Sequence, residues 1–520
     1  MPPDAERIKA AVLYVIEAGF QLTPEALEVL RGLPDDLDPL LVIRKAVELA
    51  KEADHLFLDR NDVEAALKGL IEPAVLTQEA EKAQEALEFG KGQKKTLAKE
   101  VEADIEILMD PTSEMGSSGQ LGDFLGYFRD RFKRLYGLLE QRMGVRGALC
   151  VSRALRASPG SEVKMIGMVR EKREVEGKII VILEDKGGQA TVVFTPRAGR
   201  EAYELARRLM PDQVVCVRAV RMAKDLFLAK ELVGPDVPMR NRPKEERPGE
   251  PIYAVLISDI HYGSVGFMED VFRRFLAWLN GELGNQRLRE LAGAVKYVVV
   301  AGDIVDGIGV YPGQEAELSV PDIHRQYEDV AALLSELPDH VELVLSPGNH
   351  DACRRALPQP AVPEEYAGPL YELDGAHMLG NPCLIALHGI RILVYHGNSF
   401  DDMVSVVPGL SFDDPLEMMK LMLWARHLAP IYGMKTPLAP TARDLLVIEE
   451  VPDVFHTGHI HVTACGTYRG ILLVNSGAWQ EETAYQRARG VKPTPGRAVL
   501  LDLSSLRVAE LDFTRPELWA

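Results

Sequence analysis

The amino-acid sequence predicts a multidomain α+β protein with an N-terminal helical domain, a β-barrel and a C-terminal α/β domain. Three observations lead to this expectation. Apolar residues recur at helical spacing near the N-terminus, short β-rich runs follow in the middle, and apolar runs that end in polar residues occupy the C-terminal half. A chain of 520 residues also provides for roughly three domains.

Charge and cysteine usage limit the class of protein. The formal net charge of −19 disfavours non-specific adhesion to nucleic acid, so any nucleic-acid contact must be local. The five cysteines include no C-x-x-C pair, which disfavours a disulfide framework and a zinc finger. No apolar run approaches the ~20 residues that a membrane span needs. We therefore expect a cytoplasmic protein without a membrane partner.

A small helical domain is expected over residues 1–70. Ile8 and Val12 lie at helical spacing, and Thr23 ahead of a proline is typical of a helix N-cap. Residues 71–120 contain mainly Glu, Lys, Gln and Ala, followed by Pro, Gly and Ser, with few large apolar residues. Such a composition predicts a flexible or weakly helical tether.

A helical connector is expected over residues 121–147, because apolar residues again recur at helical spacing. This segment carries a group of cations, Arg129, Arg131, Lys133 and Arg134. They form either a solvated helix face, which is the favoured interpretation, or a DNA contact. Gln120, Tyr127 and Phe128 partly match a sliding-clamp binding box, but the spacing is one residue too long.

A β-barrel is expected over residues 148–234. Four short β-rich runs occur there, at 163–169, 179–183, 191–194 and 214–220, and Gly187–Gly188 separates two of them at hairpin distance. Such strands suit a five-stranded Greek-key barrel such as the OB-fold. Few aromatic residues besides Phe194 lie in these strands, so a structural or subunit-docking role is favoured, and nucleic-acid binding stays open. Residues 235–250, rich in proline and alternating charges, predict a linker.

The C-terminal domain, expected over residues 251–520, contains five apolar runs that each end in polar side chains. These polar residues are Asp259 and His261 after 253–257, Asp303 after 297–301, Asn349, His350 and Asp351 after 341–345, His396 after 392–395, and His459 and His461 after 454–456. Such runs are typical of buried strands in a layered α/β fold. Because ligands gather outside the carboxyl ends of such strands, we expect these side chains to converge on one site.

The chemistry of these side chains fits divalent metal ions. Imidazole nitrogens and carboxylate or amide oxygens suit Mn²⁺, Fe or Zn²⁺, of which Mn²⁺ is the expected ion. Any one histidine alone would be interpreted as an ordinary core or surface residue. Their occurrence in order, each at a predicted strand end, argues against that interpretation for the set. His456 is a further candidate, although the ligand set is complete without it.

The motifs D-x-H, G-D-x-x-D, G-N-H-D, an isolated His and G-H-x-H resemble those of the calcineurin-like metallophosphoesterases, over about Ile252 to Trp479. This resemblance implies an α/β/β/α domain with two metal ions. One ion would be held by Asp259, His261, Asp303 and His461, and the other by Asp303, Asn349, His396 and His459. Asp303 would then bridge two ions that clamp a phosphate ester for in-line attack.

The same resemblance implies roles for residues that are not ligands. His350 would face the phosphate and help to protonate or stabilise the leaving oxygen, and Asp306 would orient its imidazole. Arg354 and Arg355 follow closely in the sequence. They either contact a DNA backbone near the site or form a solvated pair.

Residues around the motifs indicate the substrate. Protein phosphatases of this superfamily carry an arginine after the last aspartate of G-D-x-x-D, whereas this chain has Gly307. The segments 308–327, 354–360 and 396–402 resemble those of the small subunits of archaeal family D DNA polymerases, which share the predicted domain order. Asn398 departs from these relatives, in which a basic residue is common after His-Gly.

This second resemblance implies a proofreading 3′–5′ exonuclease subunit that acts on a mismatched or single-stranded 3′ primer end of DNA and works with a large catalytic polymerase subunit. A sliding clamp is a further candidate partner. Two alternatives stay open, a non-catalytic scaffold that needs the metal site only for stability, and a free-standing phosphodiesterase or repair nuclease. Related eukaryotic subunits keep the fold but have lost metal ligands, whereas every ligand position is filled here, which favours activity.

Overall fold

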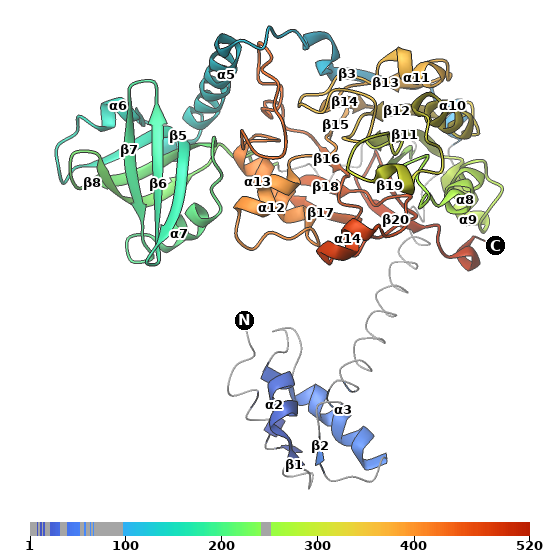
Figure 1. The fold of residues 1–520 in the computed structure, drawn as a ribbon, viewed down its shortest axis with the longest axis horizontal. Helices are drawn as coiled ribbons and strands as arrows, with labels where there is room; N and C mark the ends of the chain where they lie inside the picture. Colours follow the sequence, from blue (N-terminus) through green and yellow to red (C-terminus); the bar gives the residue numbers. More distant parts are fainter. Residues whose placement is uncertain are drawn as a thin grey trace. The chain divides into compact units, whose positions relative to one another are not determined.

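The computed structural model describes residues 97–240 and 251–519, and from the N-terminal part residues 8, 11–12, 14–15, 21–31, 39–52, 57–58, 63 and 66. The chain forms two compact units, residues 1–88 and 89–520. Figure 1 shows the mixed α+β elements of each unit. Within the described residues, no helix is both long and apolar enough to cross a membrane.

Among the described residues, the first unit contains two helices, a two-stranded sheet and further helical residues at positions 8, 11–12, 14–15, 63 and 66. Its elements are α2 (Pro24–Arg31), α3 (Pro39–Glu52), β1 (Gln21–Leu22) and β2 (Phe57–Leu58), and the two strands pair in parallel. Leu30, Val42 and Val47 are buried in its apolar core. The Ala26 amide donates to Thr23 Oγ1 (3.3 Å), which confirms the predicted N-cap. The expected domain end at residue 70 lies outside the described residues.

The second unit contains a five-stranded barrel where one was predicted. Its strands are β5 (Glu162–Val175), β6 (Lys178–Asp185), β7 (Gly188–Phe194), β8 (Val214–Arg221) and β9 (Leu226–Val233), with β4 (Leu149–Cys150) beside β5. The order β4-β5-β6-β7-β9-β8 is closed by pairing of β5 with β8, so the barrel is OB-like. Alternate residues of β6, such as Val181 and Leu183, face its core with helices α6 (Val151–Ala154) and α7 (Arg200–Arg207) alongside.

Two six-stranded sheets form the rest of this unit. The first has the order β13-β12-β11-β10-β19-β20, with bounds β10 (Tyr253–Ile257), β11 (Val295–Ala301), β12 (Glu342–Ser346), β13 (Ala376–Met378), β19 (Arg497–Asp502) and β20 (Val508–Asp512). The second has the order β17-β18-β16-β15-β14-β3, with bounds β3 (Ile105–Met109), β14 (Cys383–Leu387), β15 (Ile390–Val394), β16 (Val454–Thr457), β17 (Ala464–Tyr468) and β18 (Ile471–Asn475). Leu256 and Val299 of the first sheet share one buried core with Ile392 and Val454 of the second. The sheets are therefore stacked face to face.

Helices flank the stacked sheets (Figure 1). They are α8 (Glu269–Leu279), α9 (Gln286–Ala292), α10 (Ile323–Leu334), α11 (Glu364–Tyr371), α12 (Phe400–Val406), α13 (Pro415–Ala425) and α14 (Ala484–Arg489). Helix α11 packs beside β13, with α10 against α11. On the second sheet, Met418 and Met422 of α13 pack with Phe455 and Leu473. The core of each sheet is thus shielded from water on its outer face.

Part of the expected tether is an integral strand. β3 pairs antiparallel with β14, and Ile107 lies opposite Ile385. Asp110 then accepts a hydrogen bond from the Gly380 amide (2.9 Å). The expectation of a flexible segment was therefore wrong for residues 97–114. A short strand within a polar stretch of sequence gains its stability from the sheet that it joins. The tether residues 71–96 lie outside the described residues.

The beginning of the expected linker is also packed. Asp236 is buried, accepts a hydrogen bond from the Tyr468 hydroxyl (3.0 Å) and pairs with Arg469 (2.8 Å). Residues 235–240 therefore belong to the folded unit, because these contacts tie them to the second sheet. Residues 241–250 lie outside the described residues.

Two cations of α5 (Leu121–Glu140) join this helix to the C-terminal domain. Arg131 is fully buried, and its Nε donates to Asp444 Oδ2 (2.6 Å). Arg134 donates to Glu449 (2.6 Å) and to the Asp444 carbonyl (2.6 Å). For these two residues, both the solvated-face and the DNA-contact interpretations were wrong, because their partners lie more than 300 positions later in the chain.

The same helix uses the residues that partly match a clamp-binding box. Tyr127 is buried, and the Arg131 guanidinium lies over its ring (5.2 Å to the centroid). Phe128 packs edge-on against Tyr432 (5.2 Å between centroids). Tyr127 of this partial match is therefore occupied inside the fold.

Arg131→Ala is expected to destabilise the second unit strongly. The substitution leaves the Asp444 carboxylate buried without this charge partner, and breaking a buried pair from one side costs roughly 3–5 kcal/mol. Urea denaturation measures the loss. Arg129→Ala, on an exposed residue of the same helix, should change the free energy of unfolding by less than about 0.5 kcal/mol. Equal effects of the two substitutions would contradict the structural role of Arg131.

His427 should make stability depend on pH. Its Nε2 lies 2.9 Å from Asp444 Oδ2, and burial, aided by the charge of Arg131, lowers its pKa to about 4. The ordinary value is about 6.5, so the unfolded chain binds more protons between pH 6.5 and 4, and stability falls as the pH falls through this window. His427→Gln should remove this contribution, on the order of 3 kcal/mol. Urea denaturation of both proteins at pH 7 and pH 4 measures it, and an unchanged difference would refute the assignment.

Candidate metal centre

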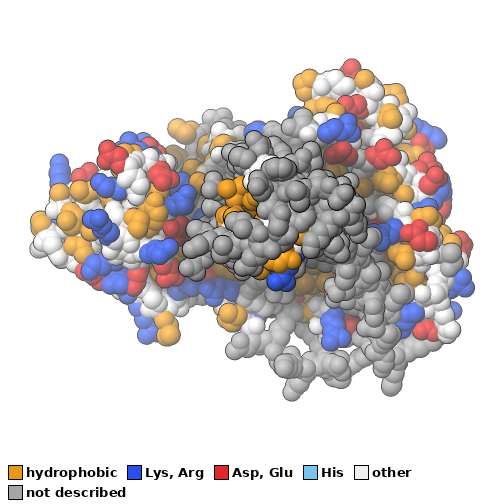
Figure 2. Space-filling model, turned by 90° about the horizontal axis from the view of Figure 1, so that it is seen from below, with side chains coloured by type: hydrophobic (Ala, Val, Ile, Leu, Met, Phe, Trp, Pro, Cys, Tyr) orange, Lys and Arg blue, Asp and Glu red, His pale blue; other side chains and the backbone are white. Residues whose placement is uncertain are grey.

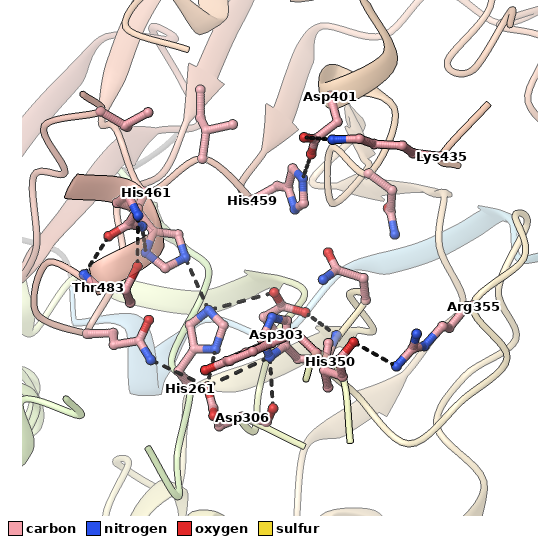
Figure 3. Close-up of a pocket in the computed structure, with 18 of the residues that line it drawn as sticks. His261, Asp303, Asp306, His350, Arg355, Asp401, Lys435, His459, His461 and Thr483 are labelled. Carbon is pink, nitrogen blue, oxygen red and sulfur yellow. Dashed lines mark hydrogen bonds and ion pairs between the residues drawn. The ribbon is translucent and has the colours of Figure 1, made fainter. Parts of the chain in front are cut away.

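The five predicted strand ends meet at one edge of the stacked sheets. β10, β11 and β12 of the first sheet and β15 and β16 of the second each end next to a polar segment. The side chains that follow these strands are Asp259, His261, Asp303, Asn349, His350, His396, His459 and His461. Figure 3 shows His261, Asp303, His350 and His461 close together around one cavity. The predicted convergence is thus present in the fold.

Five of these residues have a backbone conformation that is rare outside glycine. The angle φ is +53° at Asp259 and His261, +52° at Asp303, +76° at His459 and +59° at His461. Such conformations cost of order ~1–3 kcal/mol each and persist where the surrounding structure enforces them, commonly at functional sites. The sharp reversal of the chain after each strand turns these side chains towards one another.

Asp259, His261 and His461 form a first group whose ligand atoms lie within 4.8 Å of one another. Asp259 Oδ1 lies 3.4 Å from His461 Nε2 and 3.8 Å from His261 Nε2. His261 Nδ1 lies 3.0 Å from an oxygen of the Asp306 carboxylate. Since an ionised carboxylate can only accept, Nδ1 carries a proton, and Nε2 is the atom that faces the group and would bind an ion.

Asp303, His396 and His459 form a second group of the same kind. His396 Nδ1 donates to the Ala301 carbonyl (2.8 Å). Its Nε2 therefore faces Asn349 Oδ1 (3.0 Å) and Asp303 Oδ2 (3.2 Å). A nitrogen lone pair and two oxygens repel one another at these distances unless a cation or a proton lies between them.

Asp303 lies between the two groups. Its Oδ2 is 3.7 Å from His261 Nε2 as well as 3.2 Å from His396 Nε2, and its Oδ1 accepts from the His350 amide (2.8 Å). A Cβ at Gly348 would lie 2.1 Å from Asp303 Oδ1, so only glycine fits beside it. This carboxylate can therefore contact ions held in both groups.

The charges at the centre also fit divalent metal ions. Burial lowers the pKa of His396, but the charge of Asp303 outweighs this and raises it to about 9. Burial raises the pKa of Asp303, but the charges of His396 and His350 outweigh this and hold it below its ordinary value. In the metal-free chain a proton on His396 thus balances the carboxylate, and a bound ion must displace it. The nitrogen and oxygen donors suit Mn²⁺, Fe or Zn²⁺.

Asp401 orients His459, which the sequence did not reveal. His459 Nε2 lies 3.0 Å from Asp401 Oδ2, and Lys435 Nζ lies 3.4 Å from Asp401 Oδ1 (Figure 3). Burial raises the pKa of Asp401, but the hydrogen bond from His459 outweighs this and lowers it to about 2. The ionised carboxylate keeps the proton of His459 on Nε2 and leaves Nδ1 for a metal ion. The acidic pair Asp401-Asp402, shortly after His396, was the available signal.

Asp306 contacts His350 differently from the prediction. His350 Nδ1 lies 2.8 Å from the backbone carbonyl of Asp306, whereas the Asp306 carboxylate is 3.7 Å from His350 and 3.0 Å from His261. The carboxylate therefore orients His261, and the carbonyl orients His350, because the turn after β11 brings both groups of Asp306 into the site. Burial lowers the pKa of His350, which favours a neutral imidazole.

The two groups open into a cavity of about 730 Å³. Arg355 lines it, although its Nη2 donates to the Gly309 carbonyl (2.9 Å). Arg354 is not among the lining residues and donates to the Pro358 carbonyl (2.7 Å). The predicted arginine pair is thus divided, because neighbouring side chains of this loop point in different directions. Lys435, not identified from the sequence, brings a second cation to the cavity.

Two residues in or near the motifs, His456 and Asp351, have structural roles. His456 is buried with Nε2 2.6 Å from Ser476 Oγ, belongs to neither group, and has a pKa that burial lowers to about 3. Asp351 accepts from the Gly348 amide (2.8 Å) and the Tyr327 hydroxyl (3.1 Å). It therefore fixes the turn after β12.

Comparisons with known proteins relate the chain to B subunits and small subunits of DNA polymerases. Residues 254–464 match the family of the B subunits of DNA polymerases alpha and epsilon. The DNA polymerase II small subunit of Pyrococcus furiosus is 40% identical over 80% of this chain and 69% of its own length. That of Archaeoglobus fulgidus is 37% identical over 93% of both chains. An archaeal phosphodiesterase of solved structure is similar over 50% of this chain and 99% of its own, at 13% identity and a TM-score of only 0.27.

Divalent ions should stabilise the protein through this centre. Mn²⁺ at 100 times its Kd should add about 2.7 kcal/mol to the free energy of unfolding, seen as a raised Tm that EDTA reverses. Asp303→Asn should remove most of this gain. Asp401→Asn should weaken Mn²⁺ binding by roughly 10–100-fold, because His459 loses its orienting carboxylate.

Isothermal titration calorimetry with Mn²⁺ measures these affinities. Asp413→Asn, an exposed carboxylate that does not line the cavity, is the matched control and should bind Mn²⁺ like the unaltered chain. Unchanged affinity in both Asp303→Asn and Asp401→Asn would rule out the centre as a metal site.

Proposed function

We propose that this chain is a proofreading subunit which hydrolyses DNA phosphodiesters from the 3′ end. The chain belongs to the small subunits of archaeal DNA polymerase II, the family D enzymes. The observation that supports the proposal most is the complete set of ligating side chains. All seven positions assigned to metal ligands are filled, and Asp303 lies between the two groups that they form. A scaffold that uses the ions only for stability would need the same ligands, so the nuclease assay below separates the two alternatives.

Two divalent ions are proposed, with Mn²⁺ first and Fe or Zn²⁺ as alternatives. Asp259, His261, Asp303 and His461 would hold one, and Asp303, Asn349, His396 and His459 the other. Bound ions would supply Lewis-acid chemistry for hydrolysis of the phosphate ester. Asp306 and Asp401 would keep the imidazoles of His261 and His459 in the tautomers that this requires.

His350 is proposed to assist the leaving group. Hydrolysis adds water across the bond between phosphorus and the 3′ oxygen of the shortened strand, and this oxygen needs a proton as the bond breaks. His350 lines the cavity, and the Asp306 carbonyl occupies its Nδ1, so Nε2 is the atom that serves the substrate. Burial favours the neutral imidazole in the chain without substrate, but the negative charge of a nearby phosphodiester favours its protonated form.

Gly307 supports a substrate other than a phosphoprotein. Its φ is +71°, and a Cβ at this position would lie 2.1 Å from the His350 carbonyl oxygen. An arginine clamp of the protein-phosphatase kind therefore has no room here. Arg355 and Lys435 bring positive charge to the cavity of an otherwise acidic chain and are proposed to meet the DNA backbone.

The remaining parts are proposed to serve assembly. We infer a helical domain over 1–70, a tether shorter than expected, a connector over 121–147, the barrel, and the phosphoesterase domain that ends the chain, with a large catalytic subunit as partner. On the face seen in Figure 2, Lys and Arg side chains on the barrel, at the left, are interspersed with Asp and Glu. This mixture favours docking of another protein chain over DNA binding by the barrel.

The chain together with its large subunit should shorten a 3′-mismatched primer in the presence of Mn²⁺. His350→Ala should lower the rate by about 10²–10⁴-fold, the usual contribution of a general acid, and leave Mn²⁺ affinity unchanged. His324→Ala, outside the cavity on α10, is the matched control and should keep the full rate.

Gel analysis of labelled primer over time measures these rates. The proposal fails if the unaltered chain shows no metal-dependent shortening, alone or with the large subunit. A scaffold would instead show a lower Tm for Asp303→Asn with no nuclease rate to lose. A free-standing nuclease would act without any polymerase partner, which purification of the intact assembly tests.

A further inference from the structure

We propose that Tyr311 forms a stacking site for the unpaired nucleobase at the 3′ end of the substrate. This inference rests on the proposed exonuclease function and names what the cavity recognises beyond the phosphate. Tyr311 lies between β11 and α10, in a segment that contributes no ligand to the metal centre.

The position of Tyr311 suits a base next to the reacting phosphate. Its ring centroid lies 6.3 Å from that of His350, with 62° between the ring planes, and it lines the same cavity. The side chain is 37% exposed, so one part is packed and another is open to a ligand. A terminal nucleotide carries its base one sugar away from the scissile phosphate, so a contact to that base is expected on the cavity wall near the metal centre and not on the centre itself.

Hydrogen bonds hold the loop of Tyr311 in place before any substrate binds. The Tyr311 hydroxyl donates to Glu317 (2.8 Å). Gln314, which is buried, accepts from the Val310 amide (2.9 Å) and donates to the backbone carbonyl (2.8 Å) and carboxylate (3.0 Å) of Asp306. The ring is thus fixed relative to the metal centre through Asp306, and little ordering is lost when a base stacks on it.

The rest of the cavity wall is suited to a single nucleotide. Its apolar lining residues besides Tyr311 are Val310, Pro312, Phe412, Pro437, Ile460 and Val491. A volume of about 730 Å³ lies in the range of sites that enclose a small ligand, ~300–1,000 Å³, and is far too small for a duplex.

Stacking on Tyr311 would select DNA 3′ ends by whether the terminal base is paired, and not by which base it is. Every base has a π-face, so an aromatic side chain accepts all four bases. A paired base must first leave the duplex, at a cost of a few kcal/mol, whereas a mismatched or single-stranded base has little to lose. The site would therefore favour the ends that a proofreading enzyme should shorten.

The test compares oligothymidylates that end in a normal 3′ nucleotide or in a 3′ abasic residue. Fluorescence anisotropy in Ca²⁺ measures affinity, and primer shortening in Mn²⁺ gives kcat and KM, both with the full chain and its large subunit. Tyr311→Ala should weaken binding of the normal oligonucleotide by roughly 5–150-fold. It should leave the abasic one unchanged, and Tyr311→Phe should recover the lost affinity because the ring is kept.

Tyr371→Ala, a similarly exposed tyrosine outside the cavity, controls for general effects. The inference would be overturned by equal losses of affinity for both oligonucleotides, or by a loss in Tyr311→Phe as large as in Tyr311→Ala. Either result would mean that Tyr311 acts only structurally, through its hydrogen bond to Glu317. Binding in Ca²⁺ decides this even if the unaltered chain does not hydrolyse DNA, so failure of the proposed function is distinguishable from failure of the stacking site.

Discussion

The candidate centre depends on the face-to-face packing of two six-stranded sheets through one apolar core. Each group of ligands draws on both sheets. Asp259 and His261 follow a strand of the first sheet, and their partner His461 follows a strand of the second. Asp303 likewise comes from the first sheet, and its partner His396 from the second. A slide of one sheet against the other would separate both groups at once, so the precision of the site is a property of the core.

Those ligands were predictable because the signal is local. A buried apolar run followed by polar residues shows where a strand ends, and ligands gather at such ends whatever the rest of the chain does. The same holds for the Gly187–Gly188 hairpin, which joins β6 and β7 as predicted. Neither Asp401 nor Lys435 directly follows a predicted strand, and the two lie on separate segments that meet only in the folded chain. The preference of the Asp306 carboxylate for His261 over His350 likewise depends on side-chain direction, which spacing does not reveal.

The wrong expectations share one physical cause. Composition describes the average character of a segment, whereas a strand or an ion pair depends on a few specific partners. Five residues of β3 suffice to extend the second sheet, although the sequence on either side of them is largely polar. Arg131 has the charge of a surface residue, yet its counter-charge Asp444 lies 313 positions away and is buried with it. A charged side chain needs a polar or charged partner, but the sequence does not reveal whether that partner is water or a buried carboxylate.

The positive φ angles at Asp259, His261, Asp303, His459 and His461 bear on how such a protein evolves. Glycine or asparagine adopts this conformation more readily, so replacement of a ligand would relieve local strain and remove a buried charge. Replacement of a ligand would therefore cost the metal-free fold little, and the stability lost would be the part that bound ions contribute. A chain that retains the whole set therefore carries this local backbone strain at five of its ligand positions.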